Sequence, residues 1–274
     1  MQATALAPPT PYDHRWATLA VLCLSLLMVV MDNTILNVAL PSIATDLDAS
    51  SSELTWIVDA YSLLFAGLLL TFGALGDRFG RQGVLNLGLI TFGVASAASV
   101  FATAPEHLIF TRALMGTAAA LIMPATLSIL TNVFTDRKER AQAIAIWSGL
   151  AGAGVAIGPI TGGWLLENFD WNAIFVLNLP LVAVALAAGR LFVPTSRDPE
   201  KPSVDVAGAV LSTAGLISLV YGIIEAPESG WTSTIVLASF AAAAITLAAF
   251  VIHELRTSQP MLNLQFFRNA RFSA

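Results

Sequence analysis

The sequence predicts an all-α polytopic membrane protein, built from a six-helix bundle and two further transmembrane helices. Of the 274 residues, 56% are hydrophobic and only 11% are charged, whereas about a quarter of the residues in a soluble domain are charged. The apolar residues form eight runs, each close to the roughly 20 residues that a helix needs to cross a bilayer core. These runs cover residues 16–38, 52–72, 84–101, 107–132, 141–166, 171–192, 206–224 and 232–252.

The basic residues indicate how the chain is oriented. All Lys and Arg residues except Arg112 fall in alternate connectors, and the connectors between them carry only acids such as Asp46 and Asp170. Because positively charged loops remain on the cytoplasmic side, we expect both termini to be cytoplasmic and the protein to lie in the plasma (inner) membrane. The expected organisation is a cytosolic tail (1–15), a six-helix bundle (16–193), a cytosolic linker (194–205), an extra helix pair (206–252) and a second cytosolic tail (253–274).

Three charged residues lie well inside the apolar runs, at least five residues from either end: Asp32 in the first, Asp59 in the second and Arg112 in the fourth. A rise of about 1.5 Å per residue places each of them roughly 10–13 Å below the outer surface. Because charges in a bilayer are costly and usually face a partner or a wet cavity, we expect one polar cluster. Two acids with one base leave a negative charge that can take up a proton reversibly. The alternative is a static ion pair that fixes helix packing.

Glycine and proline mark two further stretches. Residues 73–81 form a short, charged, glycine-rich segment between the second and third runs, and this composition predicts a cytosolic turn. In the fifth run Gly154, Gly158 and Gly162 share one helix face, which favours close packing against a neighbour. Pro159 removes one backbone donor and can bend that helix. The alternative for the fifth run is generic small-residue packing.

Four motifs resemble those of the major facilitator superfamily of transporters. Residues 73–81 are similar to the family pattern Gly-x-Leu-Ala-Asp-Arg-x-Gly-Arg-Lys, and residues 154–163 to its antiporter signature. Residues 31–41 resemble the Leu-Asp-x-Thr-x-x-Asn-Val-Ala-Leu-Pro motif of the drug:proton antiporter branch with fourteen transmembrane helices. Residues 171–180 resemble the Trp-Arg-x-x-Phe-x-x-Asn-x-Pro segment at the outer start of the sixth helix. The departures from these patterns, and from the family's Arg-x-x-Gln-Gly in the fourth helix, are Met31, Gly76, Gln82, Met115 and Asn172.

The resemblance implies the N-terminal portion of such an antiporter, with six helices in two inverted three-helix repeats. It implies proton-coupled efflux (antiport) of drugs or other amphipathic small molecules, with proton coupling at Asp32, Arg112 and Asp59. The implied substrate cavity includes Thr34, Asn37, Met115 and Gly116. The implied gating residues are Gly73, Asp77, Arg78, Gly80, Arg81, Gly154, Gly158, Pro159 and Gly162. The resemblance covers only about the first half of a family member, so the implied partners are the lipid bilayer, the substrate, protons and a second transporter half.

Two other interpretations remain open: a truncated half-transporter that acts only as a membrane interaction module, and a facilitator of small nutrients. The sequence contains no nucleophile–base pair, metal-ligand set or phosphate loop, so we expect no enzyme activity, no cofactor and no metal site. The basic residues are few and scattered, which argues against a nucleic-acid partner. The single cysteine, Cys23, lies in an apolar run and is expected to be inert packing.

Overall fold

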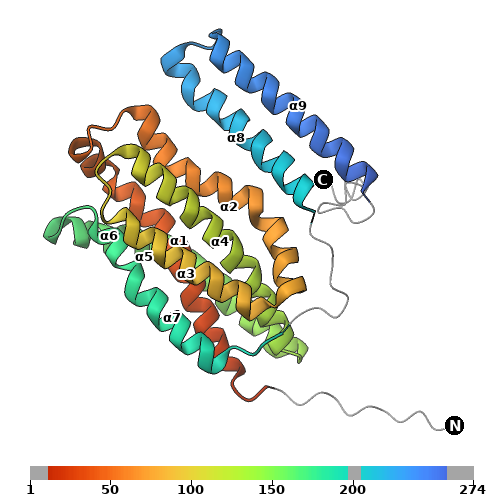
Figure 1. The fold of residues 1–274 in the computed structure, drawn as a ribbon. Coiled ribbons are helices and arrows are strands. Elements are labelled where there is room, and N and C mark those ends of the chain that lie inside the picture. Colours follow the sequence, from red (N-terminus) through yellow and green to blue (C-terminus); the bar gives the residue numbers. More distant parts are fainter. Residues whose placement is uncertain (1–11, 197–204, 258–274) are drawn as a thin grey trace.

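The computed structural model describes residues 12–196 and 205–257, and these residues are almost entirely helical (Figure 1). The helices within these ranges are α1 (Arg15–Asp46), α2 (Ser51–Phe79), α3 (Arg81–Ser99), α4 (Pro105–Val133), α5 (Arg137–Asn168), α6 (Ala173–Val176), α7 (Asn178–Phe192), α8 (Val206–Ser229) and α9 (Thr234–Arg256). Most of the two predicted tails and of the predicted linker lies outside the described residues.

Eight stretches of the described residues are long and apolar enough to cross a membrane, and they coincide with the eight predicted runs. The prediction of an all-helical polytopic chain is therefore confirmed. Several helices extend beyond the apolar runs. The 32 residues of α1 span about 48 Å at 1.5 Å per residue, longer than a bilayer core of about 30 Å.

Polar side chains begin three of these helices by satisfying backbone N–H groups that have no partner in the first turn. Ser50 accepts from the backbone N–H of Glu53, and the Glu53 carboxylate accepts from the backbone N–H of Ser50, which forms a capping box at α2. The Asp136 carboxylate caps α5 by accepting from the backbone N–H groups of Lys138 and Glu139. Asp205 accepts from the backbone N–H of Gly208 at the start of α8.

Most of the turn predicted at residues 73–81 is helix, so the prediction made the turn too long. Helix α2 continues to Phe79, and Gly80 alone separates it from α3. Gly80 has φ of +116°, a conformation that residues with a Cβ rarely adopt. Gly73 and Gly76 do not break the helix. Instead they face Pro124 of α4 and Val84 of α3, where a Cβ would be in ordinary contact distance.

The sixth predicted run forms one span, Ala173–Phe192, with a local irregularity at Leu177, whose backbone stays in the right-handed helical region. Helix α6 ends at Val176 and α7 begins at Asn178. The physical reason is Pro180, because a proline ring clashes with the carbonyl four residues earlier and supplies no N–H to it. That carbonyl belongs to Val176, directly before the irregularity.

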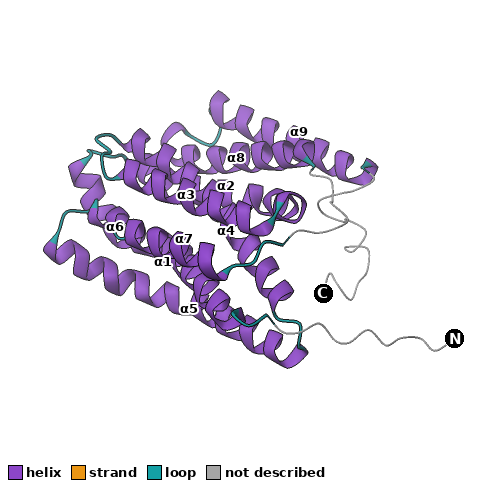
Figure 2. Ribbon diagram, turned by 60° about the horizontal axis from the view of Figure 1, so that its bottom comes forward, coloured by secondary structure: helices purple, strands orange, loops and turns teal. Residues whose placement is uncertain are grey.

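Helices α1 and α4 lie at the centre of the bundle, and the α8–α9 hairpin lies at its edge. In the most apolar window of each helix, 67% of the α1 residues and 61% of the α4 residues are buried, against 11% for α9. Figure 2 shows α5 along one side of the bundle and α9 along the opposite side. Helix α8 joins the hairpin to the bundle by packing on α2.

Glycines allow the closest helix contacts. Gly154, Gly158 and Gly162 of α5 face α1, where an added Cβ at Gly162 would lie 2.7 Å from the Cγ1 of Ile35. This confirms the predicted close approach along that face. Gly116 of α4 packs directly on the α2 backbone, and an added Cβ there would lie 2.8 Å from the Cα of Tyr61.

We predict that Gly116→Ala destabilises the protein whereas Gly152→Ala does not. The new methyl group at position 116 meets backbone atoms of Tyr61, which cannot move away cheaply, so the expected loss is about 1–3 kcal/mol. Gly152 has no neighbouring atom within 4 Å, so alanine there leaves the stability unchanged or raises it by about 0.5–1 kcal/mol. Reversible unfolding of the purified variants in lipid–detergent micelles measures both values. Equal stability of the two variants would contradict the close α2–α4 contact.

Candidate functional site

A buried ion pair joins α1 to α4. The Nη1 of Arg112 donates to the Oδ2 of Asp32 at 2.6 Å, and the two side chains are only 0% and 1% exposed. The Nε of Arg112 also donates to the backbone carbonyl of Ile57 on α2, at 3.2 Å. The structure therefore brings together two of the three charges that the sequence placed at one level.

The rest of the Arg112 side chain lies against an aromatic ring. Its Cζ is 4.2 Å from the centroid of Tyr61, a distance at which a cation is attracted to the ring face. The hydroxyl of Tyr61 in turn donates to the carbonyl of Val29 on α1, at 3.2 Å. Among the described residues, the Nη2 of Arg112 has no hydrogen-bond partner.

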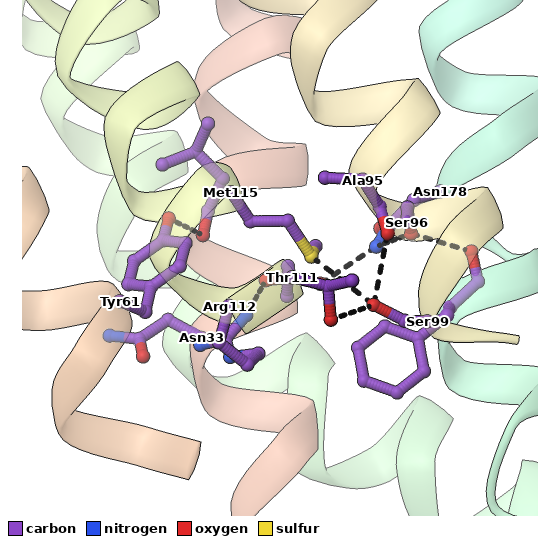
Figure 3. Close-up of polar contacts among 12 residues, drawn as sticks. Asn33, Tyr61, Ala95, Ser96, Ser99, Thr111, Arg112, Met115 and Asn178 are labelled. Atoms are coloured by element: carbon purple, nitrogen blue, oxygen red, sulfur yellow. Dashed lines mark hydrogen bonds and ion pairs between the residues drawn. The ribbon is translucent and has the colours of Figure 1, made fainter. Parts of the chain in front are cut away.

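Asn178 completes the surroundings of the Asp32 carboxylate, and sequence reasoning gave it no role. Its Nδ2 lies 2.7 Å from the Oδ1 of Asp32 and 3.0 Å from the Oγ of Ser96 on α3. Figure 3 shows Asn178 and Ser96 lying together beside the residues around Arg112. The sequence signal that could have identified Asn178 and Ser96 is that both are polar residues inside apolar runs. Burying a polar side chain is costly unless it is hydrogen-bonded.

A second polar contact joins α3 to α4 near the ion pair. The Oγ of Ser99 lies 2.8 Å from the Oγ1 of Thr111 and 4.0 Å from the Sδ of Met115 (Figure 3). Thr111 directly precedes Arg112, so this contact fixes the helical turn of α4 that presents the guanidinium.

Asp59 is not part of this cluster, which corrects the expectation of three charges together. Its side chain is half-buried, and within residues 12–196 and 205–257 it has no ion pair or hydrogen bond. The reason is helix geometry. Ile57 and Tyr61 are four residues apart and both face Arg112, whereas Asp59 lies midway between them and so projects from the other side of α2.

The four predicted cavity residues lie in different surroundings. Thr34 is half-buried in the α1–α5 contact, with its Oγ1 3.3 Å from the carbonyl of Gly154. Asn37 is exposed on α1 and donates to the carbonyl of Asn33 at 3.2 Å. Met115 and Gly116 are buried in helix contacts. A place for these residues on a substrate cavity stays a prediction.

Two of the three charged residues in 73–81, Asp77 and Arg81, pair with each other. The Oδ1 of Asp77 accepts from the Nε of Arg81 at 2.8 Å and from the Oγ of Ser128 on α4 at 3.1 Å. Arg78 is exposed, with its Cζ 5.5 Å from the ring centroid of Phe79. Asp77 therefore ties the end of α2 to α4 and to the start of α3, whereas the Arg78 side chain projects away from the bundle.

The comparisons with known proteins identify the family. The family model described as Major Facilitator Superfamily matches residues 22–267. The chain belongs to the major facilitator superfamily. As a member of this superfamily of transporters, it is a multi-pass membrane protein and not an enzyme, as the sequence predicted.

Two curated relatives of this superfamily chain are efflux or resistance proteins by name. The multidrug efflux pump LfrA of Mycolicibacterium smegmatis is 42% identical over 274 residues, which are 100% of this chain and 54% of LfrA. The methyl viologen resistance protein SmvA of Salmonella typhimurium is 36% identical over 254 residues, which are 93% of this chain and 51% of SmvA. The chain thus spans about half the length of the curated relatives it matches. In each relative the matched and unmatched residues belong to one chain, which gives no support for a second half supplied as a separate partner.

A solved structure shares the superfamily fold. The crystal structure of a mutant of the peptide transporter POT in complex with sulfate is similar with a TM-score of 0.63, over 88% of this chain and 52% of that one. The sequence identity is 15%, so this likeness concerns the fold alone.

We predict that the buried ion pair of this superfamily chain matters far more for stability than a half-exposed one. Arg112→Met leaves the Asp32 charge buried without its cation, which costs about 3–5 kcal/mol. The control is Glu139→Gln, which breaks the pair between Arg15 and Glu139, whose side chains are 21% and 32% exposed. That change should cost about 0–1 kcal/mol. Reversible unfolding at neutral pH compares the variants, and equal losses would contradict the assigned burial.

Proposed function

We propose that the protein is a proton-coupled antiporter that expels drugs or other amphipathic, cationic small molecules across the plasma membrane. The single observation that carries this proposal is the Asp32 carboxylate, fully buried and held by Arg112 and Asn178 at the centre of the bundle. The names of two relatives, a multidrug efflux pump and a methyl viologen resistance protein, support the substrate class. The proposal concerns the whole protein made from its gene.

Protonation of Asp32 gives the site a means of coupling. While Asp32 is ionised, its oxygens attract Arg112 of α4 and Asn178 of α7, and this attraction is strong in a water-poor interior. A proton on Asp32 removes the negative charge, so the attraction to Arg112 weakens and α1 can move relative to α4 and α7. Arg112 is then free to favour departure of the proton, because its positive charge stabilises the ionised form of Asp32.

The α5 glycines provide a contact along which the bundle can rearrange. Gly154, Gly158 and Gly162 bring α5 close to α1, the helix that carries Asp32. Smooth contacts between helices allow small sliding movements, and such movements underlie alternating access in transporters built from repeats. We propose that Thr34, which lies in this contact, and Asn37, which is exposed beyond it, line the substrate path.

Residues 73–81 are the proposed gate at the cytoplasmic side. Asp77, Arg81 and Ser128 hold the ends of α2, α3 and α4 together, while the exposed Arg78 is available to another part of the protein. The concentration of Arg and Lys at this end of the helices supports its cytoplasmic location. The motif at residues 31–41 and the extra pair α8 and α9 support the branch with fourteen helices.

We predict that Asp32→Asn abolishes proton-driven efflux while the protein still folds. The amide keeps the size of the side chain but cannot exchange a proton, so efflux of a fluorescent lipophilic cation should fall to the level of cells without the protein. The control is Asp46→Asn, at the exposed end of the same helix, which should retain efflux. Dye release is followed in energised cells that express the complete gene, with and without a protonophore.

Efflux that survives Asp32→Asn and still stops with the protonophore would contradict proton coupling at Asp32. Efflux of the dye by neither the unchanged protein nor the Asp46→Asn variant would contradict the proposed substrate class.

A further inference from the structure

Among the residues that the structure describes, Asn178 is the one neutral side chain that donates to the Asp32 carboxylate. It is 1% exposed, and it is the first residue of α7, directly after the irregularity at Leu177. Its Nδ2 reaches the Oδ1 of Asp32 at 2.7 Å, on the oxygen that Arg112 does not use.

The neighbours determine which way the Asn178 amide points. An ionised carboxylate only accepts hydrogen bonds, so the NH₂ group must face Asp32. Ser96 donates its hydroxyl hydrogen to the carbonyl of Phe175 at 2.9 Å, so its oxygen is free to accept the second hydrogen of Asn178 at 3.0 Å. Asn178 therefore donates one hydrogen to Asp32 and the other to Ser96, and Ser96 donates onward to the carbonyl of Phe175.

We propose that Asn178 is a positioning residue for the proton site, an inference that rests on the proposed function. Arg112 fixes the Oδ2 of Asp32 and Asn178 fixes the Oδ1, so the carboxylate cannot rotate about its bond to Cβ. Because Asn178 donates to the ionised form, it also sets the pH at which Asp32 takes up a proton. Ser96 acts one step further away by holding the amide.

Within the described part of the chain, the charged or titratable side chains that contact the Asp32 carboxylate or its partners are Arg112 of α4 and Tyr61 of α2. The contacts from α7 and α3 come from neutral side chains, Asn178 and Ser96. Replacing a neutral donor therefore alters hydrogen bonding to Asp32 without changing the charge of the site.

The test follows the protonation of Asp32 itself rather than transport. Purified protein made from the complete gene is titrated while the infrared band of its protonated carboxyl groups is recorded. The band of Asp32 is the one that disappears in Asp32→Asn. Two variants of equal shape, Asn178→Val and Asn178→Thr, differ in one hydroxyl donor. Asn172→Ala, directly before the same span and without a contact to Asp32, serves as the control.

Loss of one hydrogen bond to a charged group should move the midpoint of the Asp32 band in Asn178→Val to higher pH by about one unit, a tenfold change in proton affinity. Asn178→Thr should lie closer to the unchanged protein, and Asn172→Ala should match it. Ser96→Ala should shift the midpoint in the same direction by less, and it decides the question if Asn178→Val does not fold.

Three results would overturn the proposal, and they separate it from the proposed function. Equal shifts in the Val and Thr variants would mean that shape, not hydrogen bonding, matters at position 178. A midpoint unchanged in both Asn178→Val and Ser96→Ala would remove the role of Asn178 while leaving Asp32 as a proton site. The absence of any Asp32 titration in the unchanged protein would overturn the proposed function itself.

Discussion

The burial of one negative charge constrains the centre of this bundle. Asp32 is 1% exposed, and an isolated carboxylate in such a place would cost far more than the whole stability of a typical domain. Arg112 of α4 and Asn178 of α7 remove most of that cost by occupying its two oxygens. Three helices that are distant in the sequence, α1, α4 and α7, must therefore meet at one point.

A buried ion pair is a weak source of stability but a sensitive point of control. Hydrophobic side chains of similar volume would stabilise such a core at least as well. Under the proposed function, the retained charges make the packing of α1 against α4 and α7 depend on a single proton. This is the property that a transporter coupled to protons requires, whereas a purely structural module has no use for it.

The sequence was sufficient for the helices because bilayer thickness sets their length, and all eight predicted runs coincide with spans. It was sufficient for the pair of Asp32 and Arg112 because charges within apolar runs must find each other. It failed at Asp59, since equal depth in the membrane does not fix the side of the helix from which a residue projects. It also failed at Asn178 and Ser96, because a neutral polar residue is a weak signal until its neighbours are known. The helical path of residues 73–79 was missed because glycine packed against another helix does not have to end one.

The central claim is that Asp32 and Arg112 each offset the free-energy cost of burying the other's charge. A double-mutant cycle measures the energy of this interaction directly. The free energy of unfolding is determined at neutral pH for the unchanged protein, Asp32→Asn, Arg112→Met and the double variant. The account predicts that the double variant is more stable than the sum of the two single losses implies, by about 1 kcal/mol or more. Losses that add to within about 0.3–0.5 kcal/mol, as they do for residues that do not interact, would contradict it.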